Sequence, residues 1–390
     1  MAEPKSTVDK LVQALTPYDV LGYLLPGGAF VVTVLAFESW ARETAVAHEG
    51  ATLHTPIYTL LDRLFSSGTG TDWVLQIFAV LMFAATIYVA GHLIASVSAL
   101  AIDRTYVAKA HGYPYEQLLK ITSSSRSALS ADFYRALLFW LNVYLLLRFL
   151  ALPDAVPLRR FLPSLLTELV PETLSQARLA SVALWLSWLL VVLIIAKFVA
   201  GIETVRRDGA LKKYVKSRFS VWLIRALKFL VYMAAAPSYL ITNPVRRCIR
   251  SAQCLDEPTI EAFKSGLRRM LGFAPPEQSS STYWYAVLLL RDRAPHLCPP
   301  IDNWLLLYSF ARNLACALYL SFLYCFIWWF EHAGKLEFAN PVDKNVLFAL
   351  PLIIWASSFV MLLRYHYLYV DYYTKYLLRA VAYLGMKPGA

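Results

Sequence analysis

Long apolar segments divide this chain, and its positively charged residues fall unevenly between them. Each segment has or approaches the roughly 20 residues that a helix needs to cross about 30 Å of hydrocarbon. Six such segments are present: residues 20–37, 73–102, 136–152, 179–199, 313–330 and 345–363. Hydrophobic residues make up 58% of the chain, above the roughly 45–50% of a soluble domain. Composition therefore favours a membrane protein.

The distribution of Lys and Arg predicts how the chain is threaded. With the N-terminus in the cytoplasm and six crossings, 28 of the 37 Lys and Arg residues lie inside and 7 lie outside. This is the positive-inside pattern. Arg148 and Lys197 fall within spans, near their ends, where long side chains reach the interface. We therefore predict an all-α polytopic membrane protein with six transmembrane helices in three hairpins and both termini inside.

The same pattern divides the chain into four regions. They are a cytoplasmic amphipathic N-terminus (1–18), the first four transmembrane helices (19–199), a basic helical cytoplasmic or interfacial region (200–303), and the last two transmembrane helices with a cytoplasmic helical tail (304–390). Residues 221–241 are apolar but contain Arg225 and Lys228. A seventh span there would carry nine basic residues of 243–312 outside, so we favour a helix on the inner leaflet.

Helix signals are clearest in the two later regions. A helix is predicted between Asp256, as its cap, and Gly272, as its stop, with Pro258 in the first turn. Its apolar face consists of Ile260, Phe263, Leu267 and Met270. A second helical segment follows over 283–290. Pro295, Pro299 and Pro300 are expected to break the chain before the fifth span. The last helix is predicted to run from residue 345 to about residue 384.

Pro26, Gly27 and Gly28 interrupt the first span. Proline removes a helical hydrogen bond and glycine permits close approach, which suggests a hinge, a broken helix or a pore constriction. The alternative, which we favour, is a helix that begins after Pro26.

Small residues line one face of the second span: Gly91, Ala95 and Ala99 at four-residue intervals. This spacing predicts close packing of a helix from the same chain or from another protomer. His92 in the same span and Asn142 in the third are pore or hinge candidates, because polar residues within spans are often functional. A hydrogen bond to a neighbouring helix explains each of them as well, and we favour it for His92.

Basic residues define a predicted cytoplasmic surface. Lys212, Lys213 and Lys216 lie on the polar side of an amphipathic segment, which is typical of contact with anionic lipids. Arg312 and Arg364 flank the last two spans and would form either a basic ring in an oligomer or ordinary interfacial anchors. The net charge of +11 is thereby explained without nucleic acid, for which no binding motif is present.

Several motifs are absent from the sequence. There is no zinc-protease, serine-hydrolase, phosphate-loop or dinucleotide fingerprint, and the five cysteines lack the spacing of a zinc site. We therefore expect no cofactor, no metal and no enzymatic activity. Spans almost without acidic residues also argue against an ion-coupled transporter.

Three short motifs resemble those of a group of uncharacterised bacterial polytopic membrane proteins. They are the stretch from Asp19 to Gly27, Gly91-His92 followed by Ser96 and Ser98, and Arg312-Asn313-Leu314. Gly112-Tyr113-Pro114 in the first inner loop is also similar. Similar sequences look like components of bacterial stress or phage-defence loci. The resemblance implies an inner-membrane effector that disrupts the membrane, or a membrane-anchored partner.

Two functional hypotheses follow. The first is a homo-oligomeric channel or permeability effector. The second is a non-conducting scaffold or sensor whose basic cytoplasmic region binds a protein partner or anionic lipid. A lipid-modifying enzyme has no motif to support it.

Overall fold

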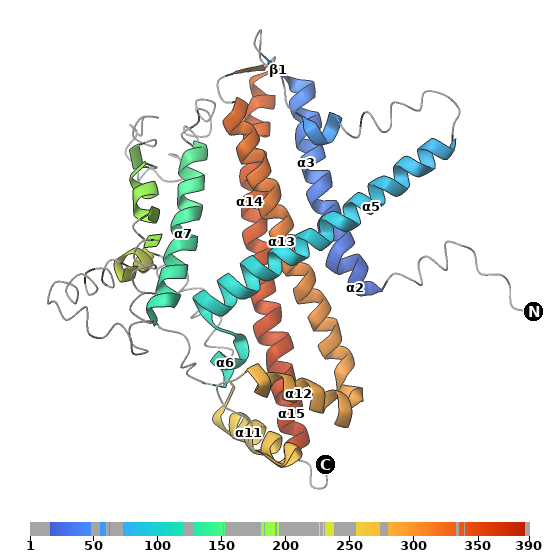
Figure 1. Ribbon diagram of the computed structural model, residues 1–390, viewed down its shortest axis with the longest axis vertical. Helices are drawn as coiled ribbons and strands as arrows, with labels where there is room; N and C mark the ends of the chain where they lie inside the picture. Colours follow the sequence, from blue (N-terminus) through green and yellow to red (C-terminus); the bar gives the residue numbers. More distant parts are fainter. Residues whose placement is uncertain are drawn as a thin grey trace, which may run out of the picture. The chain divides into compact units, whose positions relative to one another are not determined.

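The helices and strands of the computed structural model are shown in Figure 1. The described residues are 16–47, 55–59, 62, 73–119, 128–150, 152, 181–182, 184–191, 193–194, 226, 229, 231–237, 255–273, 280–332, 335–338 and 340–386. Nearly all of them are helical, which confirms the all-α class. Apart from turns and bends, the other described residues form a short antiparallel pair, β1 (Ala45–Ala47) with β2 (Leu336–Phe338), in which Ala45 lies opposite Phe338.

Five helical stretches of the described residues are long and apolar enough to cross a membrane. They are Pro17–Thr44, Ile77–Glu116, Ala131–Leu150, Pro295–His332 and Pro341–Met386. Each overlaps one of the six expected spans. The other expected span, 179–199, is described only at 181–182, 184–191 and 193–194, where it is helical. By length and composition the chain is a multi-pass helical membrane protein.

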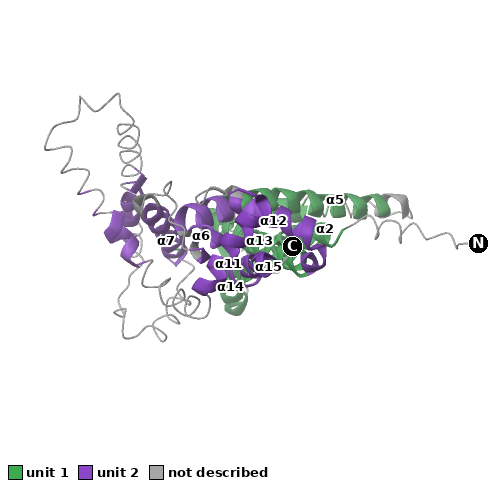
Figure 2. Cartoon of the chain, turned by 90° about the horizontal axis from the view of Figure 1, so that it is seen from below, with its two compact units in different colours: residues 1–100, 152–170, 300–369 green, residues 101–151, 171–299, 370–390 purple. Residues whose placement is uncertain are grey.

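The chain forms two compact units (Figure 2). Unit 1 comprises residues 1–100, 152–170 and 300–369. Its elements are α2 (Pro17–Asp19), η1 (Val20–Leu24), α3 (Leu25–Thr44), β1, α5 (Trp73–Ser98), most of α13 (Cys298–His332), β2 and α14 (Pro341–Tyr367).

Unit 2 comprises residues 101–151, 171–299 and 370–390. Its elements are most of η2 (Ala99–His111), α6 (Pro114–Leu118), α7 (Ala128–Leu150), α11 (Glu257–Leu271), α12 (Ser280–Arg293), η4 (Pro295–Leu297), most of η5 (Leu368–Thr374) and α15 (Lys375–Met386).

The first helix begins before Pro26, so the favoured prediction of a start after Pro26 is wrong. Thr16 and Asp19 form a capping box, in which the Asp19 N–H donates to Thr16 Oγ1 at 3.2 Å and the Thr16 N–H donates to Asp19 Oδ2 at 3.0 Å. The π-helical turn η1 follows, closed by a bond from the Leu25 N–H to the Val20 carbonyl. This wider turn joins α2 to α3 and lets the helix continue through the proline.

Two of the three prolines expected to break the chain instead lie at the start of α13. Pro299 and Pro300 occupy the first turn of α13, where a helix does not need their missing N–H groups. The expected break is confirmed before Pro295, where α12 ends at Arg293 and Ala294 is not helical, but it is wrong for Pro299 and Pro300, and α13 begins well before the predicted span. At the other end of the chain α14, η5 and α15 follow one another without interruption, which confirms the predicted long last helix.

The helix predicted from Asp256, Pro258 and Gly272 is confirmed as α11. Asp256 is its N-cap residue, and Gly272 ends it with a left-handed φ of 73°. Ile260, Phe263 and Leu267 are buried along one face. The Thr259 hydroxyl donates to the Asp256 carboxylate at 2.7 Å, and this bond lowers the pKa of Asp256 below its usual value.

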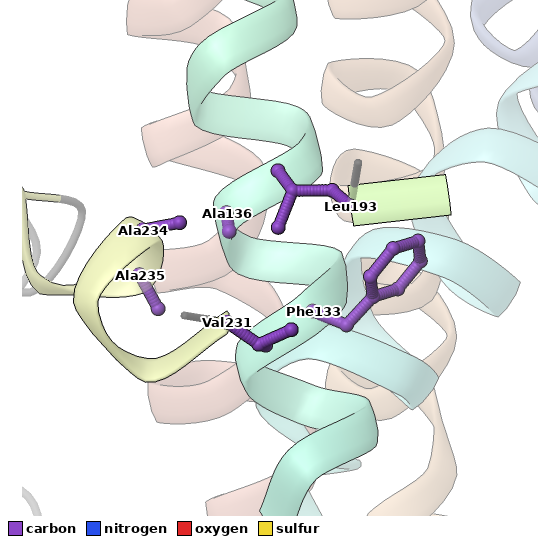
Figure 3. Packing of buried hydrophobic residues seen from close by; sticks show 6 residues of the cluster. All are labelled: Phe133, Ala136, Leu193, Val231, Ala234 and Ala235. Atoms are coloured by element: carbon purple, nitrogen blue, oxygen red, sulfur yellow. The ribbon is translucent and has the colours of Figure 1, made fainter. Parts of the chain in front are cut away.

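A buried cluster of unit 2 places part of the ambiguous segment 221–241 (Figure 3). Val231, Ala234 and Ala235 pack against Phe133 and Ala136 of α7. The Trp140 indole N–H of α7 donates to the Ala234 carbonyl at 2.8 Å. Residues 231–237 are thus helical and packed on one side, and most of the remainder of the segment lies outside the described residues.

Candidate functional site

The first two long helices of unit 1 cross at a pair of glycines. A Cβ atom built on Gly27 of α3 would overlap the Ile87 carbonyl oxygen and lie 2.7 Å from the Gly91 nitrogen. A Cβ atom on Gly91 would overlap the Tyr23 carbonyl. Backbone therefore meets backbone, which is the geometry that small residues permit between membrane helices. The partner of Gly91 belongs to the same chain.

Pro26 leaves the Gly22 carbonyl, one turn before this crossing, without its usual helical donor. In an α-helix the N–H of residue 26 would donate to the carbonyl of Gly22, but proline has no N–H. The Asn313 side chain of α13 takes that place, and its Nδ2 donates to the Gly22 oxygen at 2.7 Å. A proline in α3 is thus matched to an amide in α13.

Asn313 joins three helices. Its Oδ1 accepts the Ser98 hydroxyl at the end of α5 at 2.5 Å, and the Arg312 Nε–H at 3.1 Å. Asn313 and Ser98 are both completely buried, and Arg312 is half-buried. Interhelical hydrogen bonds of this kind are worth about 0.6–2 kcal/mol each in membrane proteins. We call Gly22, Pro26, Ser98, Arg312 and Asn313 the Asn313 junction.

An aromatic group lies next to the glycine crossing. The His92 ring of α5 stacks on Tyr23 with 3.8 Å between ring centroids, and Tyr88 meets it edge-on at 4.6 Å. Tyr18 in turn packs edge-on against Tyr23 at 5.4 Å. Among the described residues no side chain hydrogen-bonds the His92 ring. The favoured sequence interpretation, a hydrogen bond to a neighbouring helix, is replaced here by ring stacking.

His92 belongs to a face of α5 that the described residues of unit 1 leave exposed. We call the exposed residues Val89, His92, Leu93, Ser96 and Val97 the α5 outer face. Leu93 is 64% exposed and Val89 57%. The Ser96 hydroxyl donates within the helix, to the His92 carbonyl at 3.0 Å. This face combines apolar side chains with an imidazole in the middle of a candidate span.

A buried carboxylate lies at the other end of α3 and was not predicted from the sequence. Glu38 is completely buried. It accepts hydrogen bonds from the Tyr324 hydroxyl of α13, from the Tyr58 N–H at 2.5 Å and from the Ile57 N–H at 3.4 Å. The buried stripe of α3 contains Val31, Val34, Phe37, Glu38 and Ala41. The stripe continues to Ala41, beyond the predicted end of the span at residue 37. This continued helical spacing could have indicated that Glu38 is buried.

The remaining predicted residues fall in different surroundings. Gly28 has room for a side chain, since a Cβ atom there would lie 3.8 Å from Ile87. Ala95 and Ala99 are half-buried.

The Asn142 side chain donates to the Leu138 carbonyl of its own helix at 2.8 Å. Arg364 is exposed and lies over the Tyr367 ring. Lys212, Lys213 and Lys216 lie outside the described residues.

Residues from all three sequence motifs therefore meet in space. The first supplies Gly22, Tyr23 and Gly27, the second supplies Gly91, His92 and Ser98, and the third supplies Arg312 and Asn313. No family model matches the chain, and neither a curated protein nor a solved structure does. Its function must therefore be argued from this geometry.

The chemistry of the site is that of a helix junction. Within the described part of the chain no three His, Cys, Asp or Glu residues gather in a way that could hold a metal ion. The polar groups of the junction bond to one another and to backbone carbonyls. They fix the approach of α3, α5 and α13, and they leave the α5 outer face as the part of this region open to lipid, water or another protomer.

Proposed function

We propose that this chain is a homo-oligomeric, channel-like or membrane-permeabilising protein of the bacterial inner membrane. In this proposal it has six spans with both termini in the cytoplasm, and it acts as a defence or stress effector that changes the permeability of the membrane. The lipid bilayer and further copies of the same chain are its main partners.

The observation that carries the proposal is the composition of the α5 outer face. A helix that faces only lipid presents apolar side chains, because a polar group in hydrocarbon loses its hydrogen bonds to water. His92 is exposed there among Val89, Leu93 and Val97. A second protomer or a water-filled passage would supply the polar surroundings that lipid does not. An oligomer that encloses a pore would provide both the second protomer and the water-filled passage.

The Asn313 junction suits such an assembly. It holds α5 against α3 and α13 through groups of the same chain, so that the opposite side of α5 is presented in a fixed orientation. A prepositioned face loses less freedom on association than a mobile helix does.

The experiment measures particle mass and ion flux on one preparation. Purified protein is sized in detergent by light scattering and then assayed for ion flux in liposomes. Ser96→Trp places a bulky but lipid-compatible ring on the α5 outer face, and we expect a smaller particle and loss of flux. Ala356→Trp is the matched control, because Ala356 is an exposed residue of α14. Equal effects of the two substitutions, or a monomer without flux in the unmodified protein, would refute the proposal.

His92 permits a second, independent measurement. If the imidazole lines a passage, His92→Ala should change conductance or ion selectivity and leave the particle mass unchanged. Because the truncation also removes the ring contacts of His92 with Tyr23 and Tyr88, the particle mass and the unfolding temperature of the variant are measured alongside its conductance. An unchanged conductance would exclude His92 from the pore.

The alternative function is a non-conducting scaffold or sensor whose basic cytoplasmic region binds a partner or anionic lipid. Exposed cationic side chains on α11, Arg268 and Arg269, favour it. It predicts that charge reversal at Lys212, Lys213 and Lys216 abolishes the biological effect without altering insertion, and that Ser96→Trp has no effect.

A further inference from the structure

A hollow on the outer side of α11 is separate from the Asn313 junction. It has a volume of about 530 Å³ and is lined by Glu261, Lys264, Ser265, Arg268 and Arg269. Three of the five lining residues are cationic and one is anionic. A small anion entering this space would therefore meet an excess of positive charge.

The positive charge is only partly explained by helix stability. Arg268 and Arg269 lie in the last turn of α11, where cations interact favourably with the helix dipole. Lys264 precedes that turn, and it stands four residues before Arg268, where like charges destabilise a helix slightly. Neither Lys264 nor Arg269 has an ion-pair partner among the residues that the structure describes. An anion would relieve this repulsion.

The backbone under the hollow is firmly packed. On the opposite side of α11, Gly266 meets Gly385 of α15 so closely that a Cβ on Gly266 would lie 2.7 Å from the Gly385 Cα. Ile260, Phe263 and Leu267 are buried along the same side. The three cations are thus held on a rigid support, which lowers the entropic cost of binding.

We propose that this hollow binds a phosphate-bearing anion, with Lys264, Arg268 and Arg269 as its ligands. Arginine matches phosphate oxygens with two parallel N–H donors, and lysine adds a compact charge. The Ser265 hydroxyl is turned away, because it donates to the Glu261 carbonyl at 2.7 Å. An anionic lipid headgroup and a soluble phosphate compound share this chemistry. The proposal is independent of whether the protein conducts ions.

The first test titrates inorganic pyrophosphate into the full chain in nanodiscs of zwitterionic lipid, with binding followed by calorimetry. The variant is R268Q/R269Q, and the matched control is R291Q/R293Q, which removes the same charge from exposed positions of α12 outside the hollow. We expect affinity to fall about tenfold or more in the first variant and to stay unchanged in the control. The single variant Lys264→Gln should weaken binding severalfold.

The second test asks whether a lipid is the natural anion. Phosphatidylglycerol retained through detergent purification is counted by native mass spectrometry in the same set of variants. Retention that R268Q/R269Q abolishes and R291Q/R293Q keeps would assign the hollow to a headgroup, and pyrophosphate binding without such retention would assign it to a soluble compound. If the unmodified protein shows neither, or if both double variants lose binding equally, the proposal is wrong.

Discussion

Gly27 and Gly91 lie backbone to backbone where α3 crosses α5, and neither position has room for a Cβ atom. The crossing sets the position of everything around it. It brings Tyr23 onto His92, and the end of α5 carries Ser98 to Asn313.

The crossing predicts a sharp difference between neighbouring glycines. Gly91→Ala should lower the free energy of unfolding by about 1–3 kcal/mol, because the new methyl meets backbone atoms that cannot rotate away. Gly28→Ala is the control, since its Cβ would make only an ordinary 3.8 Å contact with Ile87. It should leave stability unchanged or raise it, because alanine favours helix. The measurement is thermal unfolding in detergent by tryptophan fluorescence, and equal midpoints for both variants would argue against this crossing.

Asn313 should be a more sensitive position than its partner Ser98. Asn313→Leu leaves the Gly22 carbonyl without its side-chain donor inside a buried junction, whereas the Ser98 hydroxyl keeps its hydrogen bond to the Ala95 carbonyl at 2.8 Å. We expect a loss of about 1–3 kcal/mol, because the buried Gly22 carbonyl loses this donor. Ser98→Ala removes one donor and should cost less. Chemical unfolding in mixed micelles ranks the two variants, and a larger effect of Ser98→Ala would contradict the central role of Asn313.

Pro26 and Asn313 should be energetically coupled. Pro26→Ala restores an N–H that can donate to the Gly22 carbonyl, so that this oxygen depends less on Asn313. In the Pro26→Ala background we expect Asn313→Leu to cost about 1 kcal/mol less than in the unmodified chain. A double-mutant cycle measures this difference. Strict additivity would mean that the proline and the amide act independently.

The architecture was predictable because membrane insertion leaves a strong imprint on sequence. Hydrocarbon thickness fixes the length of an apolar segment, and this constraint located five segments that the structure describes as long apolar helices. The caps of α11 were predictable for a similar reason, since Asp256 and Gly272 act within one turn of their own positions.

Helix starts near prolines were harder to predict. A proline is compatible both with a helix break and with a first turn, and only tertiary contacts decide between them. The capping box of Thr16 and Asp19 moves the start of the first helix before Pro26. The same ambiguity at Pro299 and Pro300 concealed the start of α13.

The partners within the candidate site could not be predicted from one sequence. Glycine spacing on α5 indicated a close contact but did not say that Tyr23 of the same chain provides it. The pairing of the Gly22 carbonyl with Asn313 joins residues far apart in the sequence. No local pattern encodes that contact, because it depends on how the helices are packed.

Glu38 supports a final prediction at the other end of α3. Its carboxylate accepts hydrogen bonds from the N–H groups of Ile57 and Tyr58 and from the Tyr324 hydroxyl. Glu38→Gln replaces one acceptor oxygen by an amide that is itself a donor, so at least one of these bonds is lost. We expect residues 55–59 to detach from α3, with faster proteolytic cleavage at these residues and a lower unfolding temperature.

The control for this experiment is Glu43→Gln. Glu43 is exposed on the same helix and accepts a hydrogen bond from Ser39 at 3.3 Å, so it should change neither the cleavage rate nor the unfolding temperature. Tyr324→Phe removes a single donor and should give an intermediate rate. If Glu38→Gln is cleaved no faster than Glu43→Gln, the Glu38 carboxylate does not hold residues 55–59. Otherwise, the rate of Tyr324→Phe relative to Glu38→Gln shows how much of the contact depends on the Tyr324 hydroxyl.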